Sequence, residues 1–263
     1  MKFLLENWRL YLNEITVIPN NLKQRLKNAI IDSKFWTHPH TEDEVDLGHW
    51  GDPGTPATEV LSRALDEAAK DLGSNLRFTI SVDENYPLGP GDQYEAYPNH
   101  WKTKAAYLGP LKARPYHLIK MWLRPLTEDY NMDDLDPNEL AAELSRSLNH
   151  EIVHYEQLKK QAQSKGISNE EAYQELLADP KQFSDSGDRS KYLTRHIEVD
   201  AYAHEAAEQL LDVYSAEEAL ELIKTRDPKL GGVVRDYLNV LGDNPTELKK
   251  FWLKLYSQIM SQK

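Results

Sequence analysis

The chain has 263 residues, of which 40% are hydrophobic and 28% charged, so it can bury a substantial core, unlike a disordered chain. Its formal net charge of −12 repels phosphate backbones, and the sequence offers no basic patch, which argues against a nucleic-acid partner. The lack of cysteine excludes disulfides and thiolate ligands, so a bound metal needs histidine or carboxylate ligands.

The N-terminus carries charges where a secretory signal needs an apolar core, at Lys2, Glu6 and Arg9. No stretch of the sequence approaches the length that spans a membrane. We therefore expect a cytoplasmic protein without a membrane partner.

Residues 1–135 are predicted to combine short helices with a small sheet. Apolar spacing predicts helices before Pro19 and over residues 21–31, and Thr55 with Pro56 starts a helix that Gly73 ends. Period-two alternation predicts strands, which together indicate a small antiparallel sheet. These strands cover residues 76–82 and 116–124, and residues 104–108 can add a third.

Two segments of this part are predicted to be loops. Residues 32–56 contain three histidines, which we do not expect to bind metal because they lack helical spacing. Residues 86–101 are rich in Pro, Gly and Tyr, as is typical of a long loop.

Residues 136–263 are predicted to be entirely helical. A long helix runs to about Lys165 and ends at Gly166, and a further helix covers residues 190–214. Ser168 and Ser215, each followed three residues later by Glu, start two others, and the last two helices flank Gly242. We predict a single α+β domain over residues 1–263, mainly helical, with its sheet in the N-terminal half.

The long helix carries an H-E-x-x-H motif at residues 150–154. Residues four apart share one helix face, so the imidazoles of His150 and His154 can converge on one zinc ion. The carboxylate of Glu151 can then take a proton from a water molecule that the ion activates. The position of the motif within a capped helix favours a metal site over an accident of composition.

Two histidines leave zinc without a third protein ligand. The run Glu198-Val199-Asp200-Ala201-Tyr202-Ala203 resembles the ligand helix of the gluzincins, zinc peptidases in which a glutamate on a second helix completes the site. The resemblance implies a zincin-like fold with Glu198 as third ligand. Other residues of the same helix able to bind the ion are Asp200, His204 and Glu205.

The resemblance also implies a substrate-binding strand and an oxyanion donor. Residues 116–124 are the expected edge strand, and Tyr202 is the expected donor, with Arg195 as the alternative. The residues that open the chain, Leu4-Leu5-Glu6-Asn7-Trp8-Arg9, resemble the starts of uncharacterised phage-encoded proteins.

Two functions follow from these patterns. The first is a zinc peptidase with Glu151 as base and a peptide or protein as substrate. The alternative is a noncatalytic phage-type structural or interaction protein that keeps a zincin scaffold around a structural metal. A coordination position left open would indicate the enzyme, because structural zinc sites are closed by four protein ligands.

Overall fold

The structure is a computed structural model that describes residues 20–32, 56–72, 75–82, 101–125, 137–179, 189–227, 229–242 and 244–261. The expectations for residues 1–18 and for the histidine-bearing segment, and almost all of those for residues 86–101, lie outside these ranges. Within these ranges every helix is too short or too polar to cross a bilayer. The fold is α+β, mostly helical, with one small sheet.

The sheet has three strands in the order β1-β3-β2. Their bounds are Leu76–Val82 for β1, Trp101–Leu108 for β2 and His117–Pro125 for β3. β3 pairs in parallel with β1 and antiparallel with β2, so the sheet is mixed and the prediction of an antiparallel sheet was wrong. Alternation shows which side chains are buried but not strand direction, and the long connection from β1 to β3 permits a parallel pair.

The strand order also corrects the predicted edge. β3 lies in the centre, with Ile119 and Met121 almost completely buried, so it cannot offer a free edge to a substrate. In the described part of the chain, β2 is the edge strand on the side of the sheet nearest the long helix α5, Pro137–Lys165.

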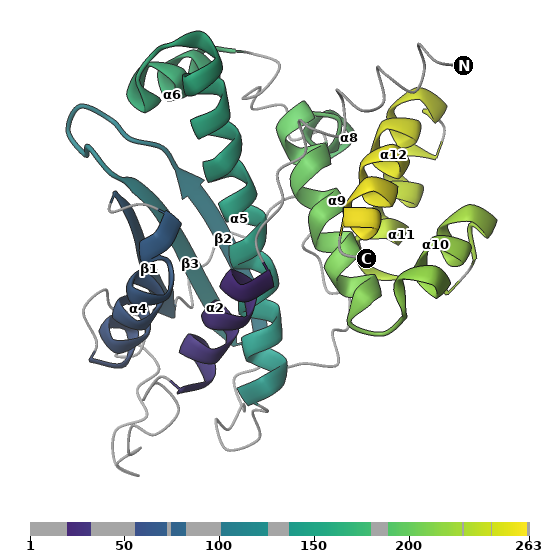
Figure 1. Cartoon of the computed structure of the whole chain (residues 1–263), viewed down its shortest axis with the longest axis horizontal. Coiled ribbons are helices and arrows are strands. Elements are labelled where there is room, and N and C mark those ends of the chain that lie inside the picture. Colours follow the sequence, from purple (N-terminus) through teal and green to yellow (C-terminus); the bar gives the residue numbers. More distant parts are fainter. Residues whose placement is uncertain are drawn as a thin grey trace.

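Helix α5 lies in the middle of the molecule, between the sheet and the C-terminal helices (Figure 1). The sheet and helix α4, Pro56–Ala68, lie on one side of α5, and the helices between residues 189 and 261, α8 to α12, lie on the other. Helix α2, Asn20–Asp32, packs against both α4 and α5. A short 3-10 helix, η2, covers Lys70–Leu72.

The helices after α5 match the predicted capping signals. Ser168 and Ser215 both form the expected capping boxes, with Glu171 and Glu218. Gly166 has a positive φ of 66°, which suits its place after α5. These helices are α6, Asn169–Ala178; α10, Ala216–Thr225; α11, Gly232–Leu241; and α12, Pro245–Ser261.

The helix predicted over residues 190–214 is two helices in the structure. Helix α8 covers Arg189–Leu193, and α9 covers His196–Leu211. Arg195 between them is extended, with φ −61° and ψ 134°, and it precedes the first turn of α9 without a side-chain cap. Leu193, beside this break, is buried in a hydrophobic cluster, and Tyr192 packs against the same cluster. The hydroxyl of buried Tyr237 donates to the Leu193 carbonyl at 3.0 Å.

Two hydrophobic cores meet where α5 packs against α9. The sheet-side core contains strand residues together with Leu144, Leu148 and Ile152 of α5. The helical-side core joins α8 to α12. Fully buried Ala201 of α9 belongs to the sheet-side core, so a small side chain lies where the two helices approach. The candidate site lies at this junction.

Candidate metal centre

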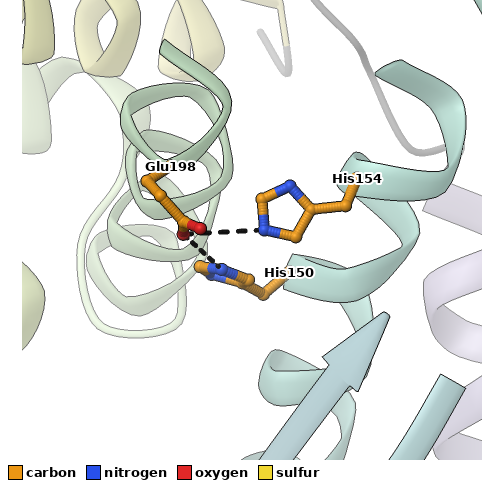
Figure 2. A group of neighbouring side chains, drawn as sticks. All are labelled: His150, His154 and Glu198. Atoms are coloured by element: carbon orange, nitrogen blue, oxygen red, sulfur yellow. Dashed lines mark ion pairs between the residues drawn. The ribbon is translucent and has the colours of Figure 1, made fainter. Parts of the chain in front are cut away.

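The two histidines of the motif project from one face of α5 toward α9. His150 is 6% exposed, and its ring lies 5.0 Å from that of His154, centroid to centroid, at an angle of 79°. Figure 2 shows both imidazoles directed at the carboxylate of Glu198 on α9. The four-residue spacing on a continuous helix is therefore enough to bring the rings together.

Glu198 lies between the two imidazoles. Its Oε2 is 3.5 Å from Nε2 of His150 and 3.6 Å from Nε2 of His154. Two ligands of a tetrahedral zinc ion, each about 2.0–2.1 Å from the metal, lie roughly 3.3 Å from one another. The observed separations differ from this value by only a few tenths of an ångström.

The electrostatics of the group also suit a cation. Burial opposes the protonation of both imidazoles, but the polar contacts of His150 with Glu198 and Glu205 raise its pKa well above the usual range. The charge of Glu198 likewise raises the pKa of His154. Burial favours the neutral acid at Glu198, yet the two imidazoles hold its pKa far below the ordinary value. A site that attracts protons in this way can exchange them for a metal ion.

The residues present fit a metal ion. The donor atoms of His150, His154 and Glu198 all lie within 4.8 Å of one another, and no other such group occurs among the described residues. Oε2 of Glu198 is buried and has no hydrogen-bond partner among the described residues. A buried carboxylate oxygen without a hydrogen bond is costly, and a cation between it and the imidazoles would remove that cost.

The other acidic and histidine residues of α9 lie elsewhere. Glu205 contacts the opposite nitrogen of His150, with Oε2 3.2 Å from Nδ1, so it supports this ligand from behind. His204 is completely buried and faces Gln258 of α12, Nδ1 to Oε1, at 3.3 Å. Asp200 forms an ion pair with Lys254. None of the three joins the ligand group.

Glu151 links the site to the sheet. Its carboxylate is buried, and Oε2 accepts a hydrogen bond of 2.6 Å from the backbone N–H of Tyr107 on β2. This N–H therefore points away from β3, toward α5. Because strand residues two apart direct their backbone groups the same way, Ala105 presents its N–H and carbonyl to this edge too.

A cavity of about 240 Å³ opens beside these groups. β2 contributes Ala105, Ala106 and Tyr107, and the two long helices contribute Glu151, His154 and Glu198. The edge of β2, the carboxylate of Glu151 and two candidate ligands, His154 and Glu198, therefore face one cavity. Its remaining walls are mainly apolar and aromatic, from Leu158, Tyr173, Leu176, Tyr192 and Ile197.

Tyr192 of α8 is a cavity residue that sequence reasoning missed. It lines the cavity together with Glu198, and burial is the main reason that its pKa lies well above the ordinary value. Arg195 lies over the Tyr192 ring, 4.9 Å from guanidinium carbon to centroid. The only sequence signal was an aromatic residue shortly before the Glu198 helix, and it was obscured by predicting one continuous helix.

Tyr202, the expected oxyanion donor, lies behind the ligands. Its ring meets that of His150 edge to face, 4.5 Å between centroids, and it packs against the helical-side core. It does not line the cavity that contains Glu151. Its contact can orient the His150 ring, whereas Tyr192 borders the cavity beside Glu198.

No protein-family model, curated protein or solved structure matches the chain.

Proposed function

We propose that the chain is a zinc-dependent hydrolase of the gluzincin type that cleaves peptide bonds. The observation that carries this proposal is the convergence of His150, His154 and Glu198, with Glu151 beside them in a cavity at the edge of β2. A bound zinc ion would supply Lewis acidity at this point. The three donor residues would hold it.

The chain's own residues have separate roles in this proposal. Glu151 is the general base: its carboxylate accepts the proton of the attacking water and passes it to the leaving amine. Tyr192 donates a hydrogen bond to the carbonyl oxygen as negative charge develops there. Tyr202 orients His150 and does not touch the substrate.

The edge of β2 favours an extended peptide as substrate. An extended chain can pair with the free backbone groups of a strand edge, which gives affinity without requiring a particular sequence. The apolar cavity walls would exclude water around the reacting groups.

The alternative is a noncatalytic protein with a structural metal. Such a site needs four protein ligands, and the described residues bring together only three. Glu205, a candidate fourth ligand, is turned to the far nitrogen of His150. The open position therefore supports catalysis.

The proposal is tested by measuring zinc content and peptide cleavage in the same preparations. We expect about one zinc per wild-type chain. Glu198→Ala should lose the metal, whereas Glu151→Gln should keep it and cleave a mixed peptide library about 10²- to 10⁴-fold more slowly. Glu156→Gln is a matched control on the same helix, because Glu156 pairs with Lys159 outside the site.

Each result has a distinct meaning. Wild-type protein without zinc would end the metal hypothesis. Zinc bound without cleavage would instead favour the structural alternative. Equal losses in Glu151→Gln and Glu156→Gln would remove the special role of Glu151.

A further inference from the structure

The nitrogen of His154 that faces away from Glu198 contacts a side chain of its own helix. Nδ1 of His154 lies 3.1 Å from Oε1 of Gln157. Because Nε2 must carry a lone pair to bind a metal, the proton belongs on Nδ1, and Gln157 must present its oxygen to accept it.

The orientation of the Gln157 amide is set by α9. Its Nε2 donates to the backbone carbonyl of Ile197 at 3.1 Å and to Oδ2 of Asp200 at 3.4 Å. A carbonyl and a carboxylate can only accept, so both require the amide nitrogen on their side. The amide oxygen is thereby left facing His154.

Asp200 is in turn held by the C-terminal helix. Nζ of Lys254 on α12 is 2.7 Å from Oδ1 of Asp200, and the two side chains are only 2% and 7% exposed. A buried lysine is rare unless it is paired. A continuous polar chain thus runs from Lys254 through Asp200 and Gln157 to His154.

A second chain reaches His150 from α11. Glu205 contacts Nδ1 of His150, and Gln209 donates to its other oxygen at 3.5 Å. The oxygen of Gln209 accepts the backbone N–H of Val233 at 3.2 Å, in the first turn of α11. A Cβ on Gly232, whose φ is +55°, would lie 2.2 Å from that oxygen, so the contact depends on glycine here.

We propose that α11 and α12 are part of the metal centre, with Lys254 and Gln209 as positioning residues. Each acts through a carboxylate on α9, and each fixes the proton and the ring orientation of one ligand histidine. The proposal rests on the metal binding of the proposed function but does not depend on peptide cleavage.

The test is zinc affinity, measured by competition with a chromophoric chelator at constant pH. Lys254→Met combined with Asp200→Leu removes both buried charges together and fills the space with apolar atoms, which generally preserves folding. We expect zinc binding to weaken about 10- to 100-fold, as is typical when the outer partner of a ligand is lost. Gln209→Leu should weaken it in the same direction.

A stability control separates positioning from folding. Leu255→Ala empties a fully buried position next to Lys254 on α12 and should lower the melting temperature. It should leave the affinity for zinc unchanged. Lys254→Arg keeps the charge and should bind zinc more tightly than Lys254→Met.

The route through Gln157 has its own readout. In a Gln157→Leu background, the Lys254→Met and Asp200→Leu pair should cause little additional loss of zinc affinity, since the chain is already broken. Additive losses would exclude this route. A folded double variant with wild-type affinity would overturn the proposal, and wild-type protein that binds no zinc would overturn it together with the proposed function.

Discussion

The two sides of the candidate metal centre are organised differently. On the sheet side, Glu151 is oriented by a backbone N–H of β2, which any residue except proline can supply. On the helical side, both candidate ligand histidines contact side chains that are held in turn by side chains of α9 and α12 and by a backbone N–H of α11. The sheet side should therefore tolerate many side-chain changes, whereas single substitutions on the helical side should disturb metal binding or folding.

The largest effect is expected from Lys254→Met alone. It leaves the Asp200 carboxylate buried without its cation, which typically costs about 3–5 kcal/mol. Urea denaturation would measure the loss. Lys165→Met is the control, since its ion pair with Glu175 joins side chains that are each 49% exposed and contributes at most about 1 kcal/mol. Similar losses in the two variants would contradict the contrast between the two pairs.

Tyr192→Phe tests whether the helical side also takes part in the chemistry. Removing one oxyanion donor commonly slows turnover about 10²- to 10³-fold. We expect such a loss in kcat with unchanged zinc content. Tyr202→Phe keeps the ring that contacts His150 and should have little effect. If Tyr202→Phe were the slower enzyme, the assignments of the two tyrosines would be reversed.

On the sheet side, stability should depend on pH through His117. Burial, and then the charges of Lys159 and Arg114, lower its pKa from 6.5 to about 4. Between these two pKa values the unfolded chain binds more protons than the folded chain. The contribution of neutral His117 to the free energy of unfolding is therefore complete above pH 6.5 and is lost as the pH falls toward 4. The loss is on the order of 2 kcal/mol once partial solvent screening is allowed for.

Denaturation midpoints from pH 7 to pH 4 would measure this dependence. His117→Gln should flatten the curve relative to wild type, while His196→Gln, at an exposed position on α9, should leave it unchanged. Parallel curves for wild type and His117→Gln would show that other groups are responsible.

The parts of the fold that could be predicted from sequence depend on local rules. Helix spacing placed His150 and His154 on one face, and capping residues marked the starts of α6 and α10. Glu198 came from a resemblance to the gluzincins, and its approach to the histidines depends on how α9 packs against α5.

The remaining features depend on contacts between distant segments. Strand direction and the edge position of β2 are set by how the chain connects, which alternation does not encode. The break that places Tyr192 in the cavity lies within an apolar pattern that continues through both helices. Lys254 looks like an ordinary surface lysine until α12 is placed against α9.

Tyr107→Pro is the sharpest test of the sheet side. The N–H of Tyr107 points away from β3, so proline here removes no bond of the β2–β3 ladder and should leave the strand in place. It removes only the donor that orients Glu151, together with the tyrosine side chain. Tyr107→Ala removes the same side chain but keeps the N–H, so the difference between the two variants isolates the hydrogen bond.

We expect the proline variant to cleave about tenfold more slowly than the alanine variant. A tenfold change corresponds to roughly 1.4 kcal/mol of activation free energy, close to the contribution of a hydrogen bond to a charged group. Both variants should retain zinc, because the ligands are supported from the helical side. Loss of zinc in the proline variant alone would mean that the sheet edge also positions the metal ligands, and the division between the two sides would no longer hold.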